Sequence, residues 1–141
     1  MYKALFAVAL AVSASSAGQA LAQAEAPAQE LGPVIQDVPG RWIWRLRPDS
    51  VLRVNVPGIG ANVLEFWIVG ENRGTSGARY AHARIGMDCA SRRFVRERLV
   101  ALDAARNVTS TSVVGDHPRN WMAFAPGTSI DGARLLLCPA A

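Results

Sequence analysis

The sequence predicts an α+β domain, in which an antiparallel β-sheet of about five or six strands carries one short C-terminal α-helix tied to it by a disulfide. Segments with the two-residue alternation of β-strands follow one another from residue 41 to residue 114, separated by short turns. Apolar residues recur at helical spacing only near the C-terminus, at 130–137. The chain contains two cysteines, and one directly follows this helical segment. A run of strands joined by short turns favours an antiparallel sheet.

The first predicted strand is the segment RWIWRLR at 41–47. Its two tryptophans and its leucine alternate with the other side chains, so they are expected to share one face of a half-buried strand. Two further strands are predicted at 51–56 and at 62–70, where β-branched and aromatic residues are concentrated. Because the segment 62–70 is almost entirely apolar, we expect it to lie in the centre of the sheet.

Three more strands are predicted in the second half of the domain, at 80–88, 93–102 and 108–114. Alternate side chains of the first of these are apolar, and the cysteine after it continues the same set: Ala81, Ala83, Ile85, Met87 and Cys89. Since alternate residues of a strand point to opposite faces, Cys89 is expected to point into the core. The other face of this strand carries polar residues, including His82 and Asp88.

The predicted helix follows a start signal, PGTS at 126–129. Thr128 and Asp131 resemble a capping box, with aspartate in the place of glutamate. The residues expected to face the sheet recur at helical spacing: Ile130, Ala133, Leu136 and Leu137. Gly132 weakens the helix by about 1 kcal/mol relative to alanine. Because so short a helix is unstable by itself in water, we expect it to depend on the sheet.

Residues 1–24 have the layout of a secretory signal peptide. A positive charge at Lys3 precedes an apolar run at 4–12, and small residues then offer cleavage sites after Ala22 and Ala24. The apolar run is about half of the roughly 20 residues that a membrane-spanning helix needs. No cysteine lies near these cleavage sites. We therefore expect an exported protein, periplasmic or secreted, with neither a membrane span nor a lipid anchor.

The rest of the chain is expected to form a flexible lead-in at 25–40 and one domain at 41–141. The lead-in contains three prolines and shows no sustained periodicity. Without Lys3, the 15 basic residues become 14 arginines, which stand against 11 acidic residues. This mild positive excess is compatible with an anionic partner, whereas export argues against a nucleic-acid partner.

The two cysteines, Cys89 and Cys138, are expected to form a disulfide, because the predicted compartment is oxidising and their number is even. Closing a loop of about 50 residues contributes on the order of 4 kcal/mol in the chain-entropy model. The alternatives have less support. The sequence contains no Cys-x-x-Cys redox motif, and the cysteines with His82 and His117 lack the spacing of zinc ligands. We expect no metal and no cofactor.

An enzyme is the less favoured hypothesis. His82 is expected at the surface, on the polar face of its strand, and His117 lies in a turn next to Asp116. A periplasmic enzyme or inhibitor would need one of these histidines in a concave pocket with a carboxylate such as Asp88 or Asp116. The sequence has no nucleophile-elbow or dinucleotide-binding motif. We expect no catalytic residue.

The strongest functional feature of the sequence is a group of arginines after Cys89. Alternation places Arg92, Arg96 and Arg98 on one strand face together with Phe94. Such a strip could bind an anionic polysaccharide, a lipid headgroup or an acidic protein. It could also be a solvated sheet face without a ligand, and the sequence leaves this choice open.

Several short motifs follow one another in a characteristic order across about residues 41–139. They are RPDSV at 47–51, EFWIV at 65–69, Tyr80 before Asp88-Cys89, SRRF at 91–94, Trp121 before PGTSI at 126–130, and Cys138. In this order and spacing the chain resembles the bacterial surface-adhesin protein E family. The resemblance implies a curved antiparallel sheet with the C-terminal helix tied to it by a disulfide. It also implies a non-catalytic role in binding host extracellular-matrix and plasma proteins, and an ability to form dimers.

The sequence therefore predicts an exported, non-catalytic binding or structural module. Its expected partners are a host or envelope protein or an anionic polymer, and a homodimer is a further expectation. The alternatives are a periplasmic enzyme inhibitor or small enzyme, and an assembly subunit that adds an edge strand to a partner.

Overall fold

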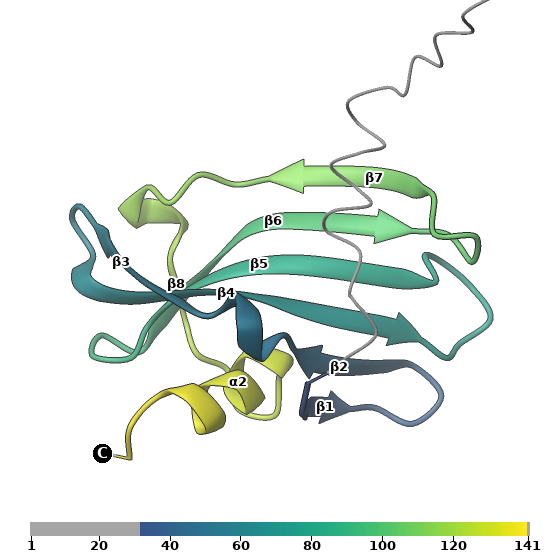
Figure 1. The fold of residues 1–141 in the computed structure, drawn as a ribbon, viewed down its shortest axis with the longest axis horizontal. Helices are drawn as coiled ribbons and strands as arrows, with labels where there is room; N and C mark the ends of the chain where they lie inside the picture. Colours follow the sequence, from purple (N-terminus) through teal and green to yellow (C-terminus); the bar gives the residue numbers. More distant parts are fainter. Residues whose placement is uncertain (1–31, 141) are drawn as a thin grey trace, which may run out of the picture.

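The computed structural model describes residues 32–140, and the predicted signal peptide at 1–24 lies outside the described residues. In this range one antiparallel sheet is accompanied by one α-helix (Figure 1). The elements are β1 (Val34–Asp37), β2 (Trp42–Leu46), β3 (Leu52–Val56), β4 (Gly60–Asn72), β5 (Tyr80–Asp88), β6 (Arg93–Leu102), β7 (Val108–Val113), β8 (Met122–Ala123) and α2 (Ser129–Leu137), with 3₁₀ turns at Pro48–Ser50 and Pro118–Asn120.

Six strands form the main path of the sheet, in the order β1-β2-β4-β5-β6-β7. Two short strands lie off this path, because β3 pairs with β4 and β8 pairs with β6. The strand pairs of the described chain are antiparallel. The sheet is curved into a half-barrel, with α2 below it in the view of Figure 1. The predicted fold class is confirmed.

The strands form close to where the sequence pattern predicts them, with two additions, β1 and the two-residue strand β8. The predicted central strand is longer than its apolar segment, since β4 runs from Gly60 to Asn72 and pairs with β2, β3 and β5. β1 lies inside the segment 25–40, for which the sequence predicts only a flexible lead-in. Its backbone pairs with β2, and α2 packs against it. Tertiary contacts thus order a segment whose own sequence shows no strand periodicity.

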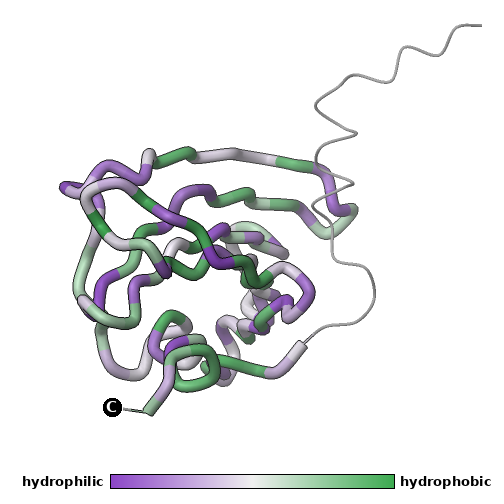
Figure 2. Tube along the Cα trace, turned by 60° about the vertical axis from the view of Figure 1, so that its left-hand side comes forward, coloured by the Kyte–Doolittle hydropathy of each residue, from purple (hydrophilic) through white to green (hydrophobic). Residues whose placement is uncertain are grey.

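The main core lies on the face of the sheet that α2 covers, which we call the helix-side face. Hydrophobic and hydrophilic residues alternate along the strands (Figure 2). On β4 and β5 the buried members of this face lie side by side in register and are at most 3% exposed: Leu64, Phe66, Ile68, Ala83, Ile85 and Met87. Full burial of one large aliphatic or aromatic side chain contributes about 1.5–3 kcal/mol, so this cluster is the main source of stability.

The helix α2 begins as predicted but buries a narrower stripe. The Thr128 hydroxyl accepts a hydrogen bond from the backbone N–H of Asp131 at 3.2 Å, which caps the first turn. Ile130 and Ala133 are buried, whereas Leu136 is 52% exposed, so its predicted contact with the sheet is wrong. Adjacent helical residues point about 100° apart, and Leu137, which does pack against the core, occupies the inward direction.

Gly132 allows α2 to lie directly on the backbone of β1. A Cβ atom at this position would be 1.8 Å from the carbonyl oxygen of Ile35, which is far inside van der Waals contact. Near the start of the helix, the Gln36 side-chain amide of β1 donates to the carbonyl of Gly127 at 2.7 Å. The local cost of a helical glycine, about 1 kcal/mol, is therefore offset by an inter-element contact that no larger residue permits.

The predicted disulfide is present and joins the end of α2 to the turn after β5. The sulfur atoms of Cys89 and Cys138 are 2.04 Å apart, and their Cα atoms are 5.6 Å apart. Both cysteines pack against the main core, as the strand alternation predicts for Cys89. A structural disulfide is typical of an oxidising compartment. Within residues 32–140, no helix has the length and apolar character needed to cross a membrane.

The opposite face of the sheet holds a second, smaller cluster. Its buried members are Val56, Val63, Val95 and Trp121. The Trp121 ring lies over Gly86, where an added Cβ would be 3.2 Å from the indole. The indole N–H donates to the backbone carbonyl of Asp116 at 2.9 Å. The loop between β7 and β8 is thereby folded back over this face.

Candidate functional site

A β-bulge in β6 decides where the predicted arginine strip lies. Arg98 pairs with Arg84 of β5, and Arg96 pairs with the next residue, Ile85, so that Glu97 is an extra residue in β6. Because Arg84 and Ile85 are consecutive, their side chains point to opposite faces of the sheet, and so do those of their partners. The prediction that Arg96 and Arg98 share a face is therefore wrong. A bulge resets the alternation, and its position is not visible in the local sequence.

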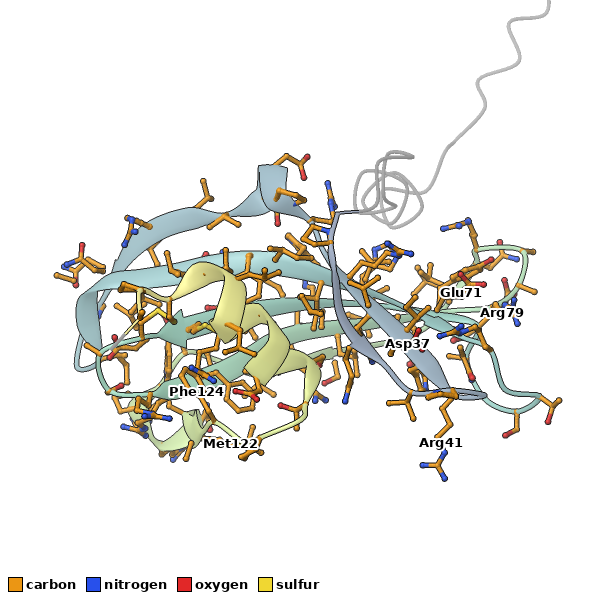
Figure 3. All side chains as sticks on the ribbon, turned by 90° about the horizontal axis from the view of Figure 1, so that it is seen from below. Asp37, Arg41, Glu71, Arg79, Met122 and Phe124 are labelled. Atoms are coloured by element: carbon orange, nitrogen blue, oxygen red, sulfur yellow. A yellow bond between two sulfur atoms is a disulfide. The ribbon has the colours of Figure 1, made fainter. Side chains whose placement is uncertain are left out.

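Arg92 and Arg96 remain on the helix-side face, next to aromatic and thioether side chains. Phe94 pairs with Met122 of β8, and its ring stacks on Phe124 with centroids 6.4 Å apart. The backbone N–H of Phe124 donates to the carbonyl of Arg92 at 3.2 Å. We call the surface formed by Arg92, Arg96, Met122 and Phe124 the β6–β8 surface. Met122 and Phe124 lie beside α2 in Figure 3.

The β6–β8 surface is open to solvent. Met122 is 51% exposed, and Arg92 and Arg96 are exposed as well. Arg92 sits in the turn between β5 and β6 with a φ of 57°, a left-handed conformation that is uncommon for a residue with a side chain. Arg96 has no ion-pair partner among residues 32–140. A free guanidinium beside apolar side chains is able to contact a carboxylate and an apolar group of one ligand.

Arg92 also contributes to the field at the start of α2. The pKa of Asp131 is lowered, chiefly by its hydrogen bond from Arg134 and by the backbone N–H of Gly127, with a smaller effect of Arg92. The Arg134 side chain binds the Asp131 carboxylate at 2.8 Å. Asp131 is thus already held by its own helix, and it does not cancel the charge of Arg92 through a direct ion pair in the described chain.

A second polar cluster, which the sequence analysis did not identify, lies on the opposite face. The Arg84 guanidinium binds the carboxylate of Glu65 on β4, and its Nε lies 3.0 Å from the carboxylate of Glu97 on β6. Only 14% of the Glu65 side chain and 13% of the Glu97 side chain are exposed. The bulge in β6 places Glu97 here, and cross-strand register places Arg84 beside it. An acidic residue inside the apolar segment NVLEFWIVG was the available signal.

Glu97 of this cluster keeps its proton to a higher pH than an ordinary glutamate does. The pKa of Glu97 is raised to about 6, mainly by burial and also by the neighbouring Glu65 and Asp116, while Arg84 lowers it. A hydrogen bond joins the side chains of Glu97 and Glu65. Glycosidases keep their catalytic carboxyl groups about 5–9.5 Å apart, so that a sugar or a water fits between them. The Glu65–Glu97 pair lacks that arrangement, and its evident property is a change of charge near pH 6.

Of the two histidines, His117 lies in the turn where the sequence predicts it, whereas His82 does not lie at the surface. His82 is 1% exposed and lies in register between Val69 and Val100, so its predicted surface position is wrong. Asp88 is six residues further along the same strand, a separation of about 20 Å in extended chain. His117 is exposed in its loop, and its Nδ1 accepts a hydrogen bond from the backbone N–H of Arg119 at 3.2 Å.

Among residues 32–140, no group of three or more His, Cys, Asp or Glu side chains is arranged to hold a metal ion.

Comparison with known proteins finds no relative of this chain. No family model, no curated protein and no solved structure matches it.

Proposed function

We propose that this chain is an exported, non-catalytic binding module that works in the periplasm or outside the cell. The layout of residues 1–24 supports export, and the Cys89–Cys138 disulfide supports an oxidising destination. The disulfide links the turn that contains Arg92 to the end of α2. A binding surface next to this staple is held in one geometry before a ligand arrives, which lowers the entropic cost of binding.

The observation that carries the proposal is the composition of the β6–β8 surface. Arginine, methionine and aromatic residues are enriched in protein interfaces relative to the rest of a protein surface. Here two exposed arginines flank Phe94, and an exposed methionine and a half-buried phenylalanine cover its other side. An exposed methionine of this kind adapts to an irregular apolar partner.

The proposed ligand is an acidic segment of a host or envelope protein. A carboxylate would bind Arg96 or Arg92, and an adjacent apolar side chain would pack on Met122 and Phe124. A polyanion such as heparin offers the charges but no apolar group, so it would use only half of this surface. The comparison of the two ligand types therefore tests which part of the surface matters.

The experiment is affinity capture with the purified chain, from an envelope fraction and on immobilised extracellular-matrix proteins, with immobilised heparin as the polyanion. The variant pair R92E and R96E is expected to lower the affinity for a captured protein by about tenfold or more, which corresponds to about 1.4 kcal/mol. M122S is expected to weaken protein capture and to leave heparin binding unchanged.

The matched control is R41E with R53E, which changes the net charge by the same amount at two other exposed positions. Arg41 lies at the end of the sheet away from Met122 and Phe124 (Figure 3). If R92E/R96E and R41E/R53E lost the same affinity for the captured protein, only the net charge would matter. Undiminished capture by R92E/R96E would remove the β6–β8 surface as the binding site.

A further inference from the structure

The chain between β7 and β8, residues 114–121, lies against the sheet beside the carboxyl pair of Glu65 and Glu97, and we call it the Trp121 loop. The backbone N–H of Val114 donates to the carbonyl of Glu97 at 2.8 Å, so this loop begins on Glu97. We propose that the Glu97 side chain is a proton-controlled latch, which holds the Trp121 loop closed when it is protonated and loosens the loop when it is charged. Because the loop leads into β8, the latch regulates the β6–β8 surface, and this consequence rests on the proposed function.

The Glu97 side chain and the Trp121 ring share the space over Gly86. A Cβ atom added to Gly86 would be 3.1 Å from Oε1 of Glu97 and 3.2 Å from the indole. The indole N–H donates to the backbone carbonyl of Asp116 at 2.9 Å, so the ring also fixes the position of Asp116. The closed loop therefore holds one carboxylate, Asp116, near a largely buried carboxyl group, Glu97.

Each element around Glu97 contributes a charged side chain to this face. β4 contributes Glu65, and β5 contributes Arg84, whose guanidinium binds both carboxylates. The Trp121 loop contributes Asp116, and β6 contributes Arg98, which lies opposite Arg84 in register. When Glu97 loses its proton, its hydrogen bond with Glu65 is lost, and three carboxylates of this cluster then repel one another.

This repulsion acts on the loop, because Asp116 is one of the three carboxylates. The pKa of Glu97 is raised to about 6, mainly by burial and also by Glu65 and Asp116. The coupling is reciprocal: since Asp116 in the closed loop makes Glu97 harder to ionise, an ionised Glu97 makes the loop harder to close. The loop is therefore closed most firmly near pH 5, where Glu97 is mostly protonated, and is looser near pH 7.5.

Other contacts of the Trp121 loop limit the movement and test its sign. The Arg93 guanidinium donates to the carbonyls of Pro118 and Trp121, both at 3.0 Å, and these contacts do not involve Glu97. We therefore expect a partial loosening of the loop. The Nδ1 atom of His117 accepts the backbone N–H of Arg119, so protonation of His117 would remove an acceptor and loosen the loop in acid. A histidine switch would thus have the opposite sign.

Both ends of the latch adjoin the β6–β8 surface. Glu97 directly follows Arg96 in β6, and Trp121 directly precedes Met122 in β8. β8 has two residues, and each of them pairs with one residue of β6, so the strand has few contacts of its own to hold it when the loop loosens. We therefore expect the surface to bind its acidic protein segment more tightly below about pH 6 than above it.

The test of the latch is hydrogen exchange, and it needs no ligand. The exchange of the Val114 amide and of the Trp121 indole N–H is followed by NMR at about pH 5 and 7.5, and it is corrected for the intrinsic pH dependence of exchange. In the wild type the protection of both groups is expected to fall several-fold at the higher pH. E97Q stays neutral and D116N lacks the opposing charge, so both variants are expected to show no such fall.

Two further variants are expected to retain the fall in protection. H117N removes the loop histidine, the side chain type that ordinarily changes charge between pH 5 and 8, and it keeps an acceptor for the Arg119 N–H. E71Q is the matched control, because Glu71 is a glutamate of β4 that pairs with an arginine outside this cluster. Protection that is equal at both pH values in the wild type, or that falls as much in E97Q, overturns the latch.

The regulation of the β6–β8 surface is tested by the Kd for immobilised extracellular-matrix protein, measured for the wild type and E97Q at both pH values. The ratio of the two Kd values cancels the titration of the ligand's own carboxylates, and it is expected to rise several-fold from pH 5 to 7.5. A constant ratio, with capture still lost in R92E/R96E, overturns the regulation and leaves the proposed function standing. Undiminished capture by R92E/R96E removes the site together with its regulation, whereas the exchange result decides the latch independently.

Discussion

The buried carboxyl pair on the second face makes stability depend on pH, and Glu97→Gln tests this directly. Burial and the neighbouring Glu65 raise the pKa of Glu97 from 4.5 to about 6. A raised pKa means that the folded state binds the proton more tightly than the unfolded state does. The stabilisation from this proton is therefore fully present below about pH 4.5, and it is lost as the pH rises through about 6.

The magnitude follows from the size of the shift. A change of about 1.5 pKa units corresponds to about 2 kcal/mol at 1.36 kcal/mol per unit. Little of this is removed by solvent screening, because the Glu97 side chain is 13% exposed. Glutamine keeps the shape and stays neutral, but it loses the charge attraction to Arg84, whose Nε is 3.0 Å away. We expect E97Q to be more stable than the wild type by about 1–2 kcal/mol near pH 7.5.

The assay is urea unfolding between about pH 4.5 and 7.5, followed by tryptophan fluorescence, since Trp121 is buried. The difference between the wild type and E97Q isolates Glu97 from the other titrating groups. It should grow by about 2 kcal/mol over this range. E71Q is the control, because Glu71 is a half-exposed glutamate of β4, the strand of Glu65, and also pairs with an arginine. A wild-type curve parallel to that of E97Q would refute the account of the carboxyl pair.

Two further predictions concern the attachment of α2. G132A should destabilise the protein by about 1–3 kcal/mol, although alanine is the better helix former, because the added methyl group would collide with the Ile35 carbonyl. The control is G115A, because no atom lies within 4 Å of its new Cβ. If thermal unfolding showed G132A to be more stable than the wild type, the close contact would be contradicted. Replacing both Cys89 and Cys138 by serine should lower the free energy of unfolding by about 4 kcal/mol, given the 49-residue separation of the two cysteines. An unchanged denaturation midpoint would show that the disulfide contributes nothing to stability.

The strands were predictable because their signal is local. In RWIWRLR and in Tyr80–Asp88 the two-residue period follows from the geometry of extended backbone, and the structure has β2 and β5 at these places. The N-cap at Thr128 is equally local, since the residues involved are three positions apart. β1 was not predictable in the same way, because its order comes from β2 and α2 and not from its own pattern.

The candidate site was predictable only in part. The sequence marks Arg92, Arg96 and Arg98 as a basic group, but the pairing of β6 with β5 decides that Arg96 and Arg98 point to opposite faces. Met122 and Phe124 join Arg92 and Arg96 through β8, about 30 residues later in the chain, and no local motif links these segments. The carboxyl pair depends on the same bulge, which turns Glu97 toward Glu65 and Arg84.

The sequence by itself determined the positions of β2 to β7, where the helix is capped, and that the two cysteines have each other as partners. These features depend on backbone periodicity, on hydrogen bonds between near neighbours and on the number of thiols. Only the tertiary structure decided that His82 is buried, that Gly132 lies against β1, and that the arginines divide between two faces. The physical reason is that one extra residue in a strand reverses every side chain after it, and only the neighbouring strand fixes where that residue lies.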